Sequence, residues 1–181
     1  MESIQQAIAD AMRFMAELEA GEHAGQVKEK VSEFFNNDVT ARGFMAALGT
    51  GNAQLSPEAN QGLLDGLRAN HEIAYDLLVK NIIMSSSAAV THEENKETDL
   101  RVSSESVTAR CVEIANQLHD ANLSKKVEEV LGAIHQYETD PKSKGDSHAI
   151  WFNFFERWGY EGRHVSAAKP HVMSILSRFE K

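Results

Sequence analysis

The sequence predicts an all-α protein: a single-domain bundle of seven or eight helices with a buried central helix and C-terminal αα-hairpins. Apolar residues recur at helical spacing through most of the 181-residue chain. Three prolines and few β-branched runs leave little of the chain suited to a sheet. This length supports one self-contained core, so we expect one domain over residues 1–181, with an exposed hinge or loop at 93–102.

The first part of the chain is expected to contain three helices. Ser3 and Gln6 make a capping box, and apolar positions then share one helix face until Gly21 supplies a C-terminal stop. A second helix begins near Val27, and a short third one ends before Gly49.

The central helix is expected to begin at Ser56 and Pro57, because serine caps free N–H groups and proline suits the first turn. It should run past Ile82. Its second half is apolar on most sides, so other helices should surround it. At Ser85–Ser87 the helix either continues with a bend or stops and resumes. The nearly all-polar Glu93–Asp99 is the expected exposed hinge or loop.

The last part of the chain is expected to fold as helical hairpins. One helix opens at 103–104 and turns at Ala121–Ser124 into a second, which makes an αα-hairpin. After a break at Pro141 an aromatic helix follows, and Gly159–Gly162 turns the chain into the last helix. Pro170 lies early in that helix, which therefore starts late or kinks there.

The aromatic helix is the most distinctive segment, because Ile150–Tyr160 holds six aromatic residues in eleven positions. Asp146 or Ser147 is expected to cap it. At 100° per residue one stripe forms, and Phe152 lies at its edge. The stripe consists of Trp151, Phe154, Phe155 and Trp158. Such a stripe either anchors a core or forms the centre of a partner surface.

The turn after this helix combines aromatic rings with a guanidinium and an imidazole, as interface hot spots do. The candidate partner-binding residues are Trp158, Tyr160, Arg163 and His164. The leading hypothesis is a non-enzymatic protein-binding or regulatory module that uses this hairpin to bind a protein partner or to self-associate. The structural alternative is that the two rings wedge the hairpin corner and the arginine is solvated.

Eight histidines favour a second hypothesis, a helical-bundle carrier of a tetrapyrrole pigment, haem or metal through histidine ligation. The candidate ligands are His71, His92, His148 and His171. An antiparallel hairpin would place His148 opposite His171. No cofactor is required by the sequence. Glu19, Glu22 and His23 lie near the end of the first helix, where adjacent glycines indicate a turn rather than a metal motif.

Charge and cysteine content set the remaining expectations. The net charge is −9, and the eighteen Lys and Arg residues are scattered, which argues against nucleic-acid partners. No run approaches about 18 apolar residues, so we expect no membrane insertion. Cys111 lies on an apolar stripe as a structural thiol. No motif specifies a reaction or catalytic residues, and a soluble cytoplasmic protein is the simplest interpretation.

Overall fold

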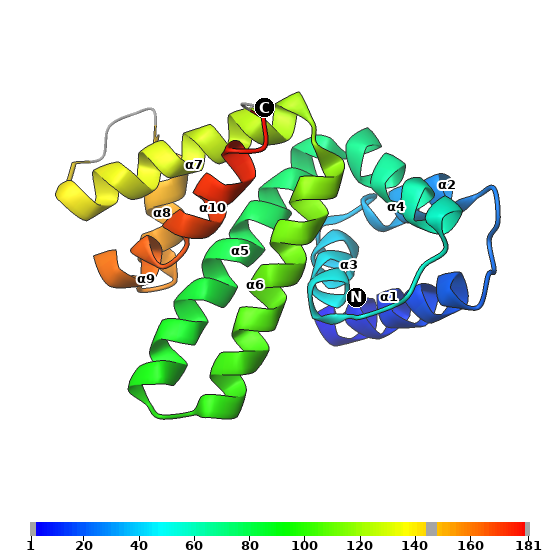
Figure 1. Ribbon diagram of the computed structural model, residues 1–181, viewed down its shortest axis with the longest axis horizontal. Coiled ribbons are helices and arrows are strands. Elements are labelled where there is room, and N and C mark those ends of the chain that lie inside the picture. Colours follow the sequence, from blue (N-terminus) through cyan, green and yellow to red (C-terminus); the bar gives the residue numbers. More distant parts are fainter. Residues whose placement is uncertain (1–2, 144–147, 180–181) are drawn as a thin grey trace. The chain divides into compact units, whose positions relative to one another are not determined.

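The computed structural model describes residues 3–143 and 148–179, and the chain is all-α, as the sequence predicts (Figure 1). Within these residues ten helical segments and no β-strand occur. In chain order they are α1 (Ile4–Glu19), α2 (Val27–Phe34), α3 (Asp38–Thr50), α4 (Pro57–Ala69), α5 (His71–Glu94), α6 (Thr98–Leu118), α7 (Ala121–Thr139), α8 (Ala149–Arg157), α9 (Gly162–Ser166) and α10 (Lys169–Leu176). The cap expected at Asp146 or Ser147 lies outside the described residues.

The helices form two compact units, Met1–Leu78 and Val79–Lys181, and the division falls inside α5. We call them unit 1 and unit 2. We expected one domain with an exposed hinge or loop at 93–102. That stretch contains the end of α5 and the start of α6, joined by a short exposed turn at 95–97.

Two of the expected helices are each divided, which is why the number of segments exceeds the predicted seven or eight. The expected central helix is interrupted at Asn70. The side-chain amide of Asn70 donates to the Gly66 carbonyl oxygen at 2.8 Å and to the Ser32 hydroxyl at 3.0 Å. The last helix is divided into α9 and α10, and Pro170 lies in the first turn of α10, where its missing N–H costs no hydrogen bond.

Helix α5 continues without interruption through its three serines. The Ser85 and Ser86 hydroxyls donate to backbone carbonyls one turn earlier, at 2.7 and 2.6 Å. The Ser85 and Thr108 hydroxyls hydrogen-bond at 2.7 Å, which joins α5 to α6, its antiparallel neighbour in Figure 1. Ser87 Oγ donates to the backbone oxygen of His164 at 3.0 Å. These buried hydroxyls are therefore satisfied without breaking the helix.

One described helix, α5, is long and apolar enough to cross a membrane, judged by length and composition only. Half of its most apolar stretch is buried inside the protein. The core helix of a soluble protein meets the same two criteria, so the evidence for a membrane span is weak.

Unit 1 packs α1 against α3 and α2 against α4 at close range. A Cβ atom added at Gly43 would lie 2.5 Å from the Ala7 Cβ, and one added at Gly66 would lie 2.6 Å from the Val31 Cβ. The absence of a side chain at these glycines is what allows the helices to approach. Beside them lies a cluster of rings with centroid separations of 4.8 to 6.4 Å, formed by Phe14, Phe34, Phe35 and Phe44.

Unit 2 packs α8, α9 and α10 against α7, and α10 also contacts α6. The face of α8 turned to the core carries Trp151, Phe152 and Phe155, all buried. The Tyr137 ring of α7 meets the rings of Phe152 and Phe155 edge-on, each at 5.1 Å. The Trp151 indole N–H donates to Glu129 Oε1 at 3.0 Å. Helix α8 is therefore anchored by these three buried aromatic side chains.

Candidate functional site

The carboxyl-terminal end of α8 leaves the core, and this corrects the predicted aromatic stripe. Phe152, which we placed at the edge of the stripe, is fully buried, whereas Trp158 is 48% exposed. Helix α8 ends at Arg157, so Trp158 is its C-cap and the chain then turns at Gly159 with φ of +67°. A glycine is favoured at this left-handed position. Trp158 is therefore the last residue before the turn, at the end of the helix, where it is half exposed.

A row of apolar side chains follows the outer edge of α8. Ile150 is 70% exposed, Phe154 is half-buried, and Trp158 follows at the same four-residue spacing. Residues four apart are neighbours on a helix surface. The Tyr160 ring stacks on the Trp158 indole at 6.4 Å and 15°, and meets Phe154 edge-on at 6.3 Å. We call these four residues, Ile150, Phe154, Trp158 and Tyr160, the aromatic surface.

Tyr160 joins this surface to the core of unit 2. Its hydroxyl hydrogen-bonds with Ser87, and its backbone oxygen accepts a hydrogen bond from the Tyr137 hydroxyl at 2.9 Å. Burial raises the pKa of the Tyr160 hydroxyl to about 12, so the ring stays neutral at physiological pH. The exposed Trp158 thus stacks on a residue that is held in place by hydrogen bonds with Ser87 and Tyr137.

The other two predicted partner-binding residues have mainly structural contacts. His164 is buried: its Nδ1 accepts a hydrogen bond from the Glu161 N–H at 3.1 Å, and its Nε2 lies 3.5 Å from the Thr91 hydroxyl. Arg163 is exposed but pairs with Glu94, and its Nε lies 3.0 Å from Glu161 Oε2. Together they hold the start of α9 against the end of α5. Of the predicted set, Trp158 is the residue that offers the most apolar surface.

Two members of the aromatic surface, Ile150 and Phe154, were not among the predicted partner-binding residues. A helical wheel places Ile150, Phe154 and Trp158 along one edge, which is a usable signal. That signal cannot tell a buried edge from an exposed one, because every apolar position on α8 suits a core equally well.

Of the four candidate histidine ligands, two lie on α5, one is the N-cap of α8 and one lies on α10. His71 lies in unit 1 and meets the Tyr75 ring edge-on at 6.0 Å, whereas the other three lie in unit 2. His92 Nδ1 hydrogen-bonds Glu97 at 2.8 Å near the end of α5. The His148 ring faces Gly132 of α7. Burial lowers the pKa of His171. Among the described residues no hydrogen bond or ring contact joins any two of these histidines, so the carrier hypothesis gains no geometric support.

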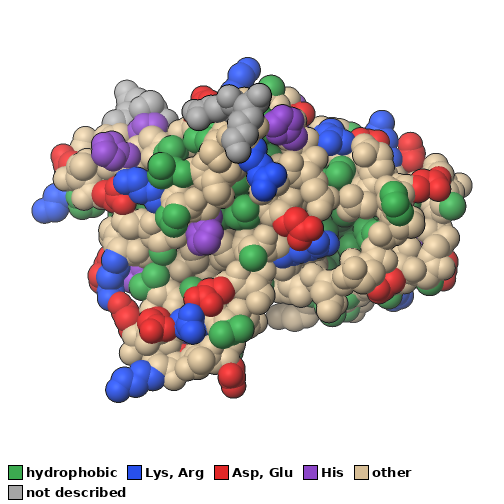
Figure 2. Space-filling view, in the orientation of Figure 1, with side chains coloured by type: hydrophobic (Ala, Val, Ile, Leu, Met, Phe, Trp, Pro, Cys, Tyr) green, Lys and Arg blue, Asp and Glu red, His purple; other side chains and the backbone are tan. Residues whose placement is uncertain are grey.

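Two further features bear on chemistry. Cys111 is buried, and burial raises the pKa of its thiol to about 12, which leaves it unsuited to act as a nucleophile. On the face of the molecule shown in Figure 2, Lys and Arg side chains lie among Asp and Glu side chains rather than in one continuous basic patch. On this face the basic side chains are therefore scattered, as the Lys and Arg residues are along the sequence.

The fold and the surface define an all-α protein with an exposed aromatic edge on unit 2. Its family is shown by a family model described as Uncharacterised conserved protein UCP020893, which matches residues 3–175. The chain belongs to this family, and the match extends over both compact units. No curated protein and no solved structure matches the chain significantly.

Proposed function

We propose that this protein is a non-enzymatic protein-binding module and that the aromatic surface of unit 2 is where a partner protein binds. The observation that carries the proposal is Trp158, which is 48% exposed while its indole stacks on the ring of the half-buried Tyr160. Tryptophan and tyrosine are enriched among the residues that dominate binding energy in protein interfaces. A single exposed apolar residue needs no explanation, but an exposed tryptophan beside two half-buried aromatic rings forms a contiguous apolar patch, which is typical of an interaction site.

The surroundings of Trp158 favour binding energetically. A partner gains most when the receiving side chain is already ordered, because association then costs less conformational entropy. Tyr160 is ordered by its hydrogen bonds with Ser87 and Tyr137, and the Trp158 indole stacks on its ring. Ile150, at the other end of the row, extends the apolar surface along α8. A partner that covers the whole row would bury an aliphatic side chain and three aromatic rings.

The rest of the molecule supports the same proposal. A net charge of −9 disfavours polyanionic ligands, so we propose a protein partner rather than nucleic acid, with a second copy of the chain as one form that partner can take. We propose no membrane insertion and a cytoplasmic location.

The test compares Trp158→Ala with Leu100→Ala, because Leu100 is 50% exposed in the same unit and lies outside the aromatic surface. Sedimentation over a range of concentrations tests self-association, and affinity capture followed by titration with the purified partner tests a different protein. We expect Trp158→Ala to weaken binding by at least about tenfold, and Leu100→Ala by less than about twofold. Equal effects of the two changes would rule out the aromatic surface as the binding site.

A further inference from the structure

The turn between α1 and α2 brings an imidazole back over the end of α1. Three of its residues have positive φ: Gly21 at 84°, His23 at 62° and Gly25 at 77°. Such a conformation is uncommon for a residue other than glycine, as His23 is. The Glu22 N–H donates to the Glu17 backbone oxygen at 2.9 Å, which closes the turn onto the last part of the helix.

This turn assembles three metal-ligating groups. His23 Nε2 lies 2.8 Å from Glu17 Oε2, and a carboxylate oxygen of Glu22 completes a group whose ligand atoms all lie within 4.8 Å of one another. The His23 ring packs against Phe14 at 5.6 Å, which holds its orientation. We expected a turn and no metal motif from Glu19, Glu22 and His23. The turn is present, but Glu17 is the third member, and Glu19 accepts a hydrogen bond from the Gln54 N–H at 2.9 Å.

We propose that Glu17, Glu22 and His23 form a binding site for a divalent transition-metal ion of the Zn²⁺ class. One imidazole nitrogen and two carboxylates are a donor set that Zn²⁺ accepts, with ligand distances near 2 Å. Imidazole disfavours Mg²⁺ and Ca²⁺, which prefer oxygen ligands only. Three protein ligands leave a coordination position for water or another ligand. His23 and Glu17 are part-buried and Glu22 is exposed, so an ion reaches the site from solvent.

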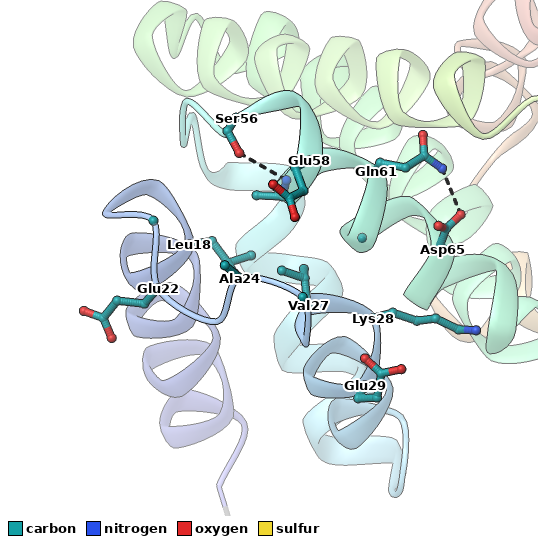
Figure 3. A pocket seen from close by; sticks show the side chains of 14 residues that line it. Leu18, Glu22, Ala24, Val27, Lys28, Glu29, Ser56, Glu58, Gln61 and Asp65 are labelled. Carbon is teal, nitrogen blue, oxygen red and sulfur yellow. Dashed lines mark hydrogen bonds between the residues drawn. The ribbon is translucent and has the colours of Figure 1, made fainter.

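A cavity of about 430 Å³ lies on the inner side of the same turn (Figure 3). Its apolar wall includes Leu18, Ala24 and Val27. Its charged residues are four acids and one base: Glu22, Glu29, Glu58, Asp65 and Lys28. In Figure 3 the Glu22 carboxylate points away from the cavity, whereas Glu58 lies over it. This excess of negative charge raises the local concentration of cations beside the proposed site.

The experiment titrates the full-length protein with ZnCl₂ by isothermal calorimetry and compares three variants. Glu22→Gln and His23→Asn each remove one ligand. Asparagine is among the few residues that adopt the positive φ found at His23. Glu29→Gln is the matched control, because Glu29 also lines the cavity but is not in the ligand group. We expect one Zn²⁺ per chain, affinity at least about tenfold weaker for the first two variants, and less than about twofold weaker for the control.

Two results would overturn the site. The first is wild-type protein that binds no Zn²⁺, and the second is equal loss of affinity in Glu22→Gln and Glu29→Gln, which would show only attraction to an acidic region. Circular dichroism checks that the variants fold. If His23→Asn does not fold, Glu22→Gln decides alone, since this exposed side chain keeps its size. Mg²⁺ at the same concentration should not displace the bound Zn²⁺.

Discussion

The glycine contacts of unit 1 and the aromatic contacts of α8 in unit 2 hold helices together by opposite means. In unit 1, helices approach closely because glycines face alanine and valine side chains, as Gly43 faces Ala7 and Gly66 faces Val31. In unit 2, α8 is held by large rings, with Trp151 and Phe155 fully buried. The first kind of packing has no room for added atoms, and the second leaves a large void when a ring is removed. The glycine contacts of unit 1 should therefore be sensitive to enlargement, and the aromatic contacts of α8 in unit 2 to truncation.

The largest expected effect is on the reactivity of Cys111, which reports on the core of unit 2. Because burial raises the pKa of its thiol to about 12, the thiolate fraction at pH 8 should be about a thousandfold below that of a thiol with the ordinary value. Alkylation by iodoacetamide, followed by mass spectrometry, should be slow in the native protein and fast in denaturant. Fast native alkylation would mean that this part of unit 2 opens readily.

Truncation of Trp151 tests the aromatic packing of unit 2. Trp151→Ala should lower the free energy of unfolding by about 3–5 kcal/mol, because it leaves a cavity and removes the hydrogen bond to Glu129. Chemical denaturation monitored by circular dichroism measures this loss. Trp158→Ala is the matched control and should cost less than about 1 kcal/mol, since that side chain is half exposed. Similar losses for both tryptophans would contradict the assignment of opposite roles.

Enlargement of Gly43 tests the close packing of unit 1. Gly43→Ala should destabilise the protein by about 1–3 kcal/mol, because the new Cβ would lie 2.7 Å from the Ala7 backbone carbon, which cannot move aside freely. Thermal unfolding measures the change. The same substitution at Gly162 is the control: nothing lies within 4 Å and its φ is ordinary, so the effect should stay within about 1 kcal/mol. A neutral Gly43→Ala would remove the contrast between the units.

The smallest effect is expected from an ion pair in unit 2. Glu138 accepts hydrogen bonds from Lys169 at 2.8 Å and Ser166 at 2.5 Å, and these partners lower its pKa. A carboxyl whose folded pKa is lowered stabilises the fold above its unfolded pKa, and this contribution disappears as the pH falls through the folded value. Glu138→Gln should therefore cost at most about 1 kcal/mol at neutral pH and nothing in acid.

The control for this ion pair is Glu33→Gln in unit 1, because Glu33 pairs with Lys30 in a more solvent-exposed setting. We expect no measurable change in stability from Glu33→Gln at either pH, since surface ion pairs of this kind are screened by water. A pH-independent loss from Glu138→Gln would assign its role to packing rather than to charge.

The sequence by itself determined the features that depend on local chemistry. The all-α class follows from apolar spacing, and the caps at Ser3 and Ser56 follow from residue preference: each side chain accepts the expected backbone N–H at 3.2 Å. The burial of Cys111 follows from its place on an apolar stripe. These inferences succeed because each depends on residues within one helix.

Only the tertiary structure decided which face of each helix is covered. Phe152 and Trp158 are both apolar positions of the same helix, yet one is buried and the other is half exposed. Likewise, the positive φ at His23 brings its ring to Glu17 rather than leaving it in a simple turn. Periodicity places a side chain on a helix face, but what covers that face, and where a turn sends the chain, depends on contacts with residues far away in sequence.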